Sequence, residues 1–305
     1  MLDRFNRTVL IGPVAVLALT IPQSLPLHRP AARPPAKASS RLYFDIRWPD
    51  HAQIFAMNPD GGNRVCLTPT SDSDYRPAMS PDGRTIAFTT HRDKVRAIYL
   101  MNTDGTNQRR LTHDGDAGLC CWSPDGSHLA FSSSRNGQYC IYTMRRDGSG
   151  VRLLTSGPSD DCPSWSPDGR KVAYESDRDG KWRVVIVDLD GVSKVVTDPK
   201  WSARWPQWTP DGAGIVYTSY EQGNGDIYLM RPDGSNPVQL TTNPADDRQP
   251  FITADGRQIL FSSNRAGKYD LYVLDRATHA EHRLTAEMKD TGDVISIGRS
   301  SAAKP

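Results

Sequence analysis

The sequence predicts an all-β fold, a six-bladed β-propeller with four antiparallel strands in each blade. Three observations predict it: a constant repeat, turn signals that recur at fixed places in each repeat, and a C-terminal segment that supplies a strand missing from the first repeat. Consecutive repeats are 43 or 44 residues apart, measured on the aromatic residue that ends an apolar triplet: Phe44, Phe88, Phe131, Tyr174, Tyr217 and Phe261. Such a period, with strand signals inside each unit, is typical of propellers and solenoids.

The first hairpin of each repeat is marked by its turn. In Ser80-Pro81-Asp82-Gly83 the proline presets φ for the second position of a type I turn, and the glycine takes the positive φ that follows. Related turns recur at 123–126, 166–169, 209–212 and 253–256. We therefore expect an innermost strand before each turn and a second strand after it.

The second strand of each repeat is apolar on both faces, as in "TIAF", "HLAF", "KVAY", "GIVY" and "QILF". A strand with one exposed face would alternate apolar and polar residues, so both faces of these strands must be covered by neighbouring blades. Trp122, Trp165 and Trp208, each just before the turn, are expected to pack between blades as well.

A second hairpin and a closing motif complete each unit. Asp-Gly pairs, a strong hairpin signal, recur at Asp60-Gly61, Asp104-Gly105, Asp147-Gly148, Asp190-Gly191 and Asp233-Gly234. A short strand then ends in Leu-Thr, with Val196-Thr197 as a variant. Each unit therefore contains four strands, the composition of a propeller blade.

The two ends of the chain are expected to share one blade. The first repeat starts at "RLYFDI" and lacks its innermost strand, whereas the C-terminal segment "VISI" (Val294 to Ile297) is an extra innermost strand. If this segment completes the first blade, the ring closes and no sheet edge is left open between its ends. This gives six blades rather than a linear array.

The propeller is expected to span residues 41–298, with a disordered tail at 299–305. Residues 1–22 are interpreted as a signal peptide or an N-terminal anchor, because Arg4 and Arg7 precede an apolar run that is short for a membrane span of about 20 residues. Residues 23–40 form a Pro-rich linker. Both alternatives predict a periplasmic or otherwise extracytoplasmic propeller, in contact with the membrane only through an uncleaved N-terminal segment.

The composition excludes nucleic acids as partners and does not decide whether the cysteines form disulfides. After residue 40 the chain carries 32 bases and 34 acids, so it lacks the positive charge that nucleic-acid binding requires. The five cysteines are an odd number. Cys162 could form a disulfide with Cys120 or Cys121, or these residues could be buried thiols in the repeat core.

Together the Ser-Pro-Asp-Gly turn, "IYLM", Asp-Gly and Leu-Thr resemble the TolB-like propeller, a WD-repeat-like family. No Trp-Asp pair closes the third strand as in the standard WD repeat. The resemblance implies a role in the Tol–Pal system of the cell envelope, without the additional α/β domain that precedes the propeller of full TolB. Similar blades precede prolyl-oligopeptidase-type hydrolases, but the sequence has no Gly-x-Ser-x-Gly elbow.

The binding site is expected on one face of the disc. Both hairpin turns of every blade lie on one face, the hairpin face, while the second-to-third-strand loops and the blade-to-blade connectors lie on the other, the connector face. The connectors are diverse, and binding residues favour variable loops on rigid scaffolds. The candidate binding residues are Asp74, Asp116, Asp160, Asp161, Trp201, Arg204, Trp205, Asp246, Asp247, Arg248 and Asp290.

The connectors are also acidic, with 12 acids and five bases. A ring of carboxylates around a channel mouth would attract a basic peptide or a cation, and calcium in the channel mouth is the cofactor that such a ring would bind. Alternatively, these aspartates cap turns through hydrogen bonds to the backbone. Trp201 and Trp205 in one connector suit peptide anchoring or stacking on sugars, unless they fold back onto the rim.

The first functional hypothesis is an exported, monomeric, non-catalytic propeller that binds a protein or peptide, for which the family suggests a peptidoglycan-associated lipoprotein. The second is a carbohydrate-binding propeller that uses its loop tryptophans. The third is an enzyme, such as a metal-dependent lyase or a hydrolase. The seven histidines are scattered through loops and termini, and no catalytic set can be nominated from the sequence.

Overall fold

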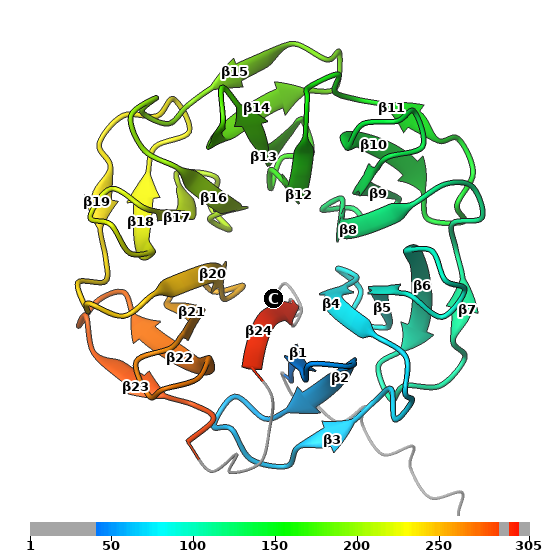
Figure 1. Cartoon of the computed structure of the whole chain (residues 1–305), viewed down its shortest axis with the longest axis horizontal. Coiled ribbons are helices and arrows are strands. Elements are labelled where there is room, and N and C mark those ends of the chain that lie inside the picture. Colours follow the sequence, from blue (N-terminus) through cyan, green and yellow to red (C-terminus); the bar gives the residue numbers. More distant parts are fainter. Residues whose placement is uncertain (1–40, 287–292, 299–305) are drawn as a thin grey trace, which may run out of the picture. The chain divides into compact units, whose positions relative to one another are not determined.

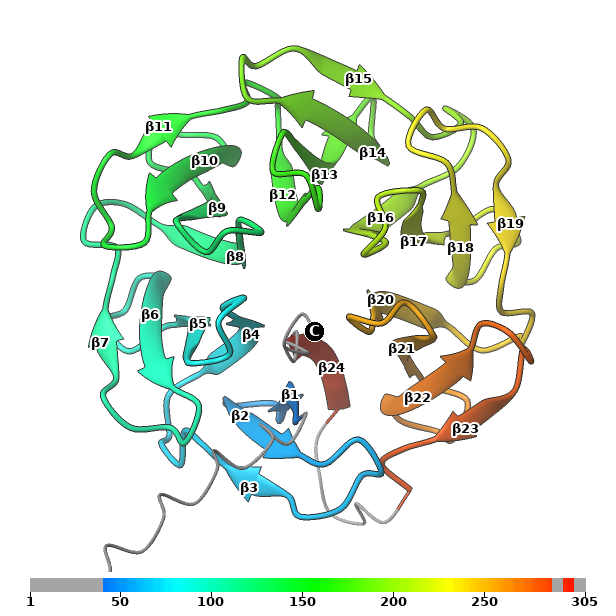
Figure 2. The ribbon, with the colours of Figure 1, turned by 180° about the vertical axis from the view of Figure 1, so that it is seen from behind.

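The computed structural model describes residues 41–286 and 293–298, which form six four-stranded antiparallel sheets arranged as a ring (Figure 1; Figure 2 from behind). The described residues all belong to one compact unit, residues 38–305. They contain no helix that is long and apolar enough to span a membrane. The predicted all-β propeller of six blades is therefore confirmed.

Within each blade the strands follow one another from the centre of the ring outward. The innermost strands of blades 1 to 6 are β24 (Asp293–Gly298), β4 (Asp74–Met79), β8 (Ala117–Trp122), β12 (Asp160–Trp165), β16 (Ala203–Trp208) and β20 (Asp247–Ile252). The second strands are β1 (Leu42–Arg47), β5 (Thr85–Thr90), β9 (His128–Ser133), β13 (Lys171–Arg178), β17 (Ile215–Ser219) and β21 (Gln258–Ser263). The third strands are β2 (Ala52–Met57), β6 (Ala97–Asn102), β10 (Cys140–Arg145), β14 (Lys181–Asp188), β18 (Asp226–Met230) and β22 (Asp270–Asp275).

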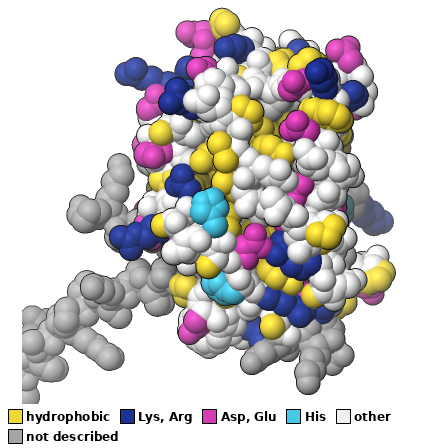
Figure 3. All heavy atoms as spheres, turned by 90° about the vertical axis from the view of Figure 1, so that its left-hand side faces the viewer, with side chains coloured by type: hydrophobic (Ala, Val, Ile, Leu, Met, Phe, Trp, Pro, Cys, Tyr) yellow, Lys and Arg dark blue, Asp and Glu magenta, His cyan; other side chains and the backbone are white. Residues whose placement is uncertain are grey.

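The outermost strands are short: β3 (Val65–Cys66), β7 (Arg109–Arg110), β11 (Arg152–Leu153), β15 (Ser193–Val195), β19 (Val238–Gln239) and β23 (Glu281–Arg283). Two or three residues per edge offer little template for pairing with another chain. On the side of the ring that carries β19, acidic, basic and apolar side chains are interspersed (Figure 3). This side therefore presents no extended surface of a single charge.

The ring closes as the sequence predicts. The first sheet has the order β24-β1-β2-β3, and Phe44 of β1 lies opposite Ile297 of β24 in an antiparallel pair. In Figure 1 the C-terminal strand lies beside the N-terminal strand at the centre of the ring. The first and last strands of the chain are therefore hydrogen-bonded neighbours.

The hydrophobic core is divided into layers between adjacent blades. One layer joins Tyr43, Ile54 and Leu67 of blade 1 to Met79, Ile86, Phe88 and Met101 of blade 2. Trp122 and Trp208 are buried in corresponding layers, and the half-buried Trp165 packs against a third. The second strands are covered on both faces, and the tryptophans pack between blades, as expected.

The repeated Leu-Thr motif satisfies one backbone group in every blade. Thr68 Oγ1 accepts a hydrogen bond from the amide of Ile54 at 2.9 Å, and the threonines of the other five blades do the same for the third strand at 2.9–3.0 Å. The Asp-Gly turn of the next blade rests on this motif. A Cβ on Gly105, whose φ is +86°, would lie 2.7 Å from Leu67 O, so only glycine fits.

Candidate functional site

The innermost strands share a bulge that turns one residue toward the centre of the ring. Arg76, Cys162, Trp205 and Gln249 occupy the same position of β4, β12, β16 and β20, and each has a φ between +53° and +57°. Each precedes a proline, and each lies where the register with the second strand shifts. Non-glycine residues rarely adopt this conformation, which costs about 1–3 kcal/mol and is concentrated at functional sites.

These bulges line the central space. A cavity of about 80 Å³ is lined by Arg76, Leu119, Cys162, Trp205 and Gln249, among others. A second cavity, of about 130 Å³, lies nearer the hairpin face and is lined by residues that include Met79, Trp122 and Trp165. We call the connector-face end of this space the channel mouth. It is defined by the second residues of the five innermost strands with described side chains: Tyr75, Gly118, Asp161, Arg204 and Arg248.

Two buried carboxylates hold two of the bulges. Asp45 of β1 accepts a hydrogen bond from the amide of Arg76 at 2.9 Å, and Glu175 of β13 accepts one from the amide of Trp205 at 2.9 Å. Both acids are fully buried and stand where the second strands of the other four blades carry serine or threonine. Asp45 belongs to blade 1 and Glu175 to blade 4, with two blades between them on either side, so the same device is used on opposite sides of the ring.

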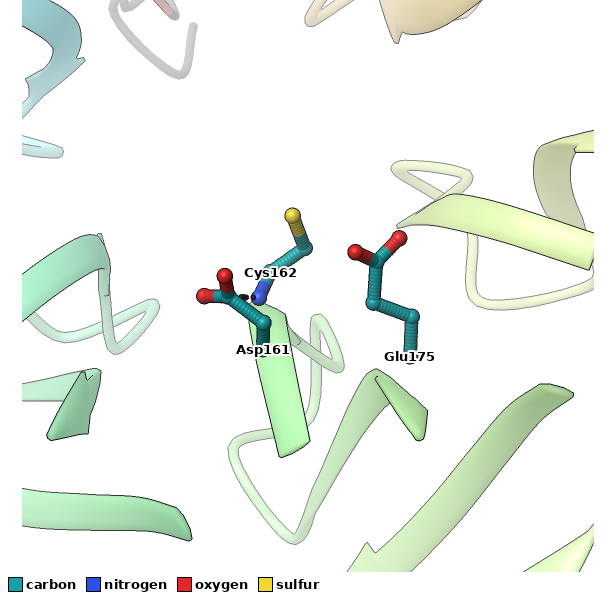
Figure 4. A group of neighbouring side chains, drawn as sticks. All are labelled: Asp161, Cys162 and Glu175. Atoms are coloured by element: carbon teal, nitrogen blue, oxygen red, sulfur yellow. Dashed lines mark hydrogen bonds between the residues drawn. The ribbon is translucent and has the colours of Figure 1, made fainter. Parts of the chain in front are cut away.

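Figure 4 shows Glu175 beside Asp161 and Cys162, and the potential ligand atoms of the three residues lie within 4.8 Å of one another. Asp161 Oδ1 accepts from the amide of Cys162 at 2.8 Å. Arg204 donates to Glu175 Oε1 at 2.7 Å and to Oε2 at 3.3 Å. Because a guanidinium already occupies the cation position beside Glu175, a metal ion would have to displace it.

The thiol of this group, that of Cys162, is buried. Burial raises the pKa of Cys162, and the nearby carboxylates of Glu175 and Asp161 raise it further. Cys162 is a free cysteine, so of the two alternatives left open by the sequence the disulfide to Cys120 or Cys121 is not formed. The alternative interpretation, buried thiols in the repeat core, describes Cys140 and Cys162.

Three of the candidate aspartates begin innermost strands and are fully buried: Asp74, Asp160 and Asp247. Asp74 pairs with Arg92 at 2.6 Å, and Asp247 pairs with Arg265 at 2.7 Å. Asp160 accepts from Thr155 Oγ1, Ser176 Oγ and the amide of Gly157. The structure therefore places these three carboxylates inside the blades, where they hold connectors and loops together.

Arginines compensate the acids nearer the channel mouth. Asp116 accepts from Arg96 at 2.8 and 3.2 Å and from Tyr139, and Asp246 lies 3.5 Å from Arg248. Arg92, Arg96 and Arg265 come from second-to-third-strand loops, which a charge count over the connectors alone leaves out. Among the described residues of the connector face, the carboxylates of Asp74, Asp116, Asp246 and Asp247 are each compensated by an arginine.

Arginines stacked on aromatic rings surround the channel mouth. Arg47 lies 4.9 Å from the ring centre of Tyr75, Arg96 lies 4.7 Å from Tyr139, Arg204 lies 4.1 Å from Trp182 and Arg248 lies 3.6 Å from Tyr269. Each arginine also pairs with a carboxylate, that of Asp45, Asp116, Glu175 or Asp246. We call these four arginine–aromatic pairs the arginine–aromatic belt.

The remaining candidates fall in different environments. Trp205 is buried in the central space, whereas Trp201 is 40% exposed on its connector. Arg204 and Arg248 are members of the belt, and Asp290 lies outside the described residues. The structure thus brings Asp161, Arg204, Trp205, Asp246 and Arg248 to the channel and its mouth.

Sequence reasoning missed Arg47, Tyr75, Arg96, Tyr139 and Tyr269, and it did not foresee that Arg204 stacks on Trp182. Two signals in the sequence point to the bulges. One is a proline inside four innermost strands, since proline in a strand marks an edge or a bulge. The other is a single acid inside two apolar second strands, in "YFDI" and "AYES". No comparable signal marks the stacked pairs, because their partners are distant in sequence.

Comparison with known proteins agrees with this architecture. The model of the TolB beta propeller domain family matches residues 28–198 and 162–300. The chain belongs to the TolB beta propeller family. The crystal structure of TolB from Acinetobacter baumannii superposes with a TM-score of 0.76 at 23% identity, over 87% of this chain and 68% of that one. The putative TolB of Agrobacterium tumefaciens gives 0.69 at 23% identity, over 80% and 88%.

One curated relative has a different description. The putative tricorn protease homolog 2 of Streptomyces coelicolor is 38% identical over 73 residues. These residues make up 23% of this chain and 6% of that protein, so the similarity covers less than two TolB-type blades. It carries no information about the activity of this TolB-family propeller as a whole.

Proposed function

We propose that this protein is a non-catalytic, extracytoplasmic propeller that binds a partner protein at the mouth of its central channel. The observation that carries the proposal is the arginine–aromatic belt. Arginine, tyrosine and tryptophan are the residues that most often dominate the energy of protein interfaces. Four such pairs surround one channel mouth.

The side chains of the belt are held by contacts within the chain itself. Each arginine is held between an aromatic ring and a carboxylate, as Arg248 is between Tyr269 and Asp246. Ordering a long side chain on binding costs about 0.5–1.5 kcal/mol, so this arrangement lowers the cost of association. The carboxylates are engaged by arginines and are poorly placed to act as general bases, which supports a binding role rather than a catalytic one.

The family favours a partner of the Tol–Pal type, a peptidoglycan-associated lipoprotein in the periplasm. We propose to measure the affinity of the purified chain for this lipoprotein by isothermal titration calorimetry. Arg248→Ala removes the shortest stacking contact of the belt and should weaken binding at least about tenfold, or about 1.4 kcal/mol.

The matched control is Arg84→Ala, which removes an exposed arginine from a hairpin turn on the opposite face and should leave the affinity unchanged. Equal weakening by both substitutions would remove the belt from the interface. Absence of any binding by the unmodified chain would exclude this partner.

Trp201 supports a second candidate function, carbohydrate binding. It is the one tryptophan among the exposed large hydrophobic side chains of the described residues. Exposed indole rings provide a flat surface on which sugars stack. Glycan-array binding that is lost in Trp201→Ala and kept in Arg248→Ala would favour this function over protein binding at the belt.

A further inference from the structure

The hairpin face contains slots between neighbouring blades that both carry a Ser-Pro-Asp-Gly-type turn, which are blades 2 to 6. One wall of such a slot is the Ser-Pro-Asp-Gly-type turn of the first blade of the pair. The other wall is formed by the second blade of the pair, through its own Ser-Pro-Asp-Gly-type turn and its Asp-Gly-type turn. Between blades 2 and 3 the slot is filled by Arg146, which comes from the Asp-Gly turn of blade 3. Its guanidinium donates to Asp82 Oδ2 at 2.9 Å and to Thr85 Oγ1 at 3.0 Å, and lies 5.4 Å from the ring centre of Trp122.

Arg276 occupies the slot between blades 5 and 6. It stands at the same position of its blade as Arg146 and donates to the carbonyl of Gly256 at 2.6 Å. The acid of the neighbouring turn is Asp211. A hydrogen bond from Thr209, the amide of Ala213 and the charge of Arg276 lower the pKa of Asp211. The fold therefore places a guanidinium in this kind of slot twice.

The slot between blades 4 and 5 has an equivalent tryptophan and an equivalent aspartate but no arginine. Trp208 stands in place of Trp122, and Asp168 stands in place of Asp82. The position of Arg146 is taken by Pro232, which has no donor to offer. A pocket of about 500 Å³ is found here, lined by residues that include Asp168, Lys171, Trp208, Asp211 and Pro232.

The two slots share their backbone geometry. A Cβ on Gly126 would lie 3.4 Å from Pro81 Cδ in the filled slot, and one on Gly212 would lie 3.9 Å from Pro167 Cδ in the open one. The turns of adjacent blades thus approach each other in the same way. The side chains differ at two positions, Pro232 in place of Arg146 and Lys171 in place of Thr85, and the pocket corresponds to the space that Arg146 fills.

Asp168 is available for a cation. One of its oxygens accepts from Ser166 Oγ and from the amide of Arg170, and within the described part of the chain it forms no ion pair. The hydrogen bond from Ser166 lowers the pKa of Asp168, so this carboxylate is ionised at neutral pH. Its counterpart Asp82 has an arginine in this place.

We propose that the slot between blades 4 and 5 is a binding site for an arginine side chain of a partner protein. The guanidinium would pair with Asp168 beside Trp208, as Arg146 pairs with Asp82 beside Trp122. Arginine fits better than lysine because its planar fork can bond a carboxylate and a second acceptor together. This site lies on the hairpin face and goes beyond the partner proposed for the channel mouth.

One residue limits the affinity of the open slot. Lys171 stands where Thr85 accepts a hydrogen bond from Arg146, and its ammonium group repels an incoming cation. Replacing it with threonine recreates the filled slot, so Lys171→Thr should bind an arginine peptide several-fold more tightly than the unmodified chain. Unchanged or weaker binding in this variant would contradict the analogy between the two slots.

The test uses the full chain and the blocked peptide acetyl-Gly-Arg-Gly-amide, titrated while the indole N–H resonance of Trp208 is followed by NMR. The matched peptide with citrulline in place of arginine has the same shape without the charge. We expect a saturable shift with the arginine peptide and at least tenfold weaker binding of the citrulline peptide. Equal binding of the two peptides, or no shift with either, would overturn the proposal.

Three variants locate the site. Asp168→Asn should abolish binding, whereas Asp125→Asn, the same change in the turn of blade 3, should not. Pro232→Arg should fill the slot from within and block the peptide. Pro232→Ala, which leaves the slot open, controls for loss of the proline, and the spectrum of each free variant reports whether it is folded. Binding that survives Asp168→Asn or Pro232→Arg in a folded protein would place the peptide elsewhere and refute the proposal.

Discussion

Replacement of Thr155 by valine tests why every blade carries a threonine two residues after its outermost strand. Thr155 Oγ1 accepts from the amide of Ile141 at 2.9 Å and donates to Asp160 Oδ2 at 2.5 Å, in a buried site. Valine has the same shape but no hydroxyl group. The substitution therefore leaves a buried amide without an acceptor and takes one of three donors from a buried carboxylate.

The expected cost follows from these two bonds. An unsatisfied buried donor costs about 1–3 kcal/mol, and a hydrogen bond to a charged group contributes about 1.5–3 kcal/mol. Because the two losses share one atom, we expect Thr155→Val to lower the free energy of unfolding by about 3–4 kcal/mol. Thr155→Ser keeps both bonds and loses one methyl group, a cost of about 1 kcal/mol.

Equilibrium unfolding in urea, followed by tryptophan fluorescence, measures these differences. Thr68→Val provides an internal comparison, because Thr68 Oγ1 accepts from the amide of Ile54 but bonds no carboxylate among the described residues. It should cost about 1–2 kcal/mol, less than Thr155→Val. If Thr155→Ser proved as harmful as Thr155→Val, the threonines would be needed for their methyl groups and the hydrogen-bond explanation would be refuted.

Three further predictions follow from single residues. Gly105→Ala should lower the melting temperature, because φ is +86° and the new Cβ would lie 2.7 Å from Leu67 O; an unchanged value would show that the turn can shift. Burial, and next the charge of Asp247, raise the pKa of Asp226 from 3.8 to about 6. The folded state therefore binds the proton of the Asp226 carboxyl group more tightly than the unfolded state, and the protein loses stability as the pH rises from about 4 to 6. The melting temperature of Asp226→Asn relative to the unmodified chain should rise over that range and then stay constant, whereas a constant difference would assign the pH dependence to other groups. Burial raises the pKa of the Cys162 thiol, so at pH 8 iodoacetamide should modify it, as followed by mass spectrometry, only when urea unfolds the chain; rapid modification of the folded protein would contradict its burial.

The fold was predictable because its signals are local and repeated. The turn at Ser80, the Asp-Gly pair at Asp104 and the Leu-Thr pair at Leu67 each fix the backbone over a few residues, and the same set recurs in each unit. Even the closure of the ring could be inferred, since a missing strand at one end matched an extra strand at the other.

The candidate site was predictable only in its location. The sequence directed attention to the connectors, and Arg204, Trp205 and Arg248 do lie at the channel or its mouth. It gave no sign that Asp74 would be fully buried against Arg92, because the two come from different loops of one blade. A charge count along the chain cannot show which opposite charges meet in space.

The sequence alone determined the number of blades, the order of the strands and the pairing of the two chain ends. Hairpins and their turns depend on residues only a few positions apart, and the repeat shows the same turn and strand pattern in each unit. Only the tertiary structure decided which side chains are stacked, buried or left without a partner. Those contacts join different loops and blades, as Glu175 joins Arg204 and as Asp168 faces an empty slot beside Pro232. Their energies depend on burial and on distances across the ring, which no local pattern encodes.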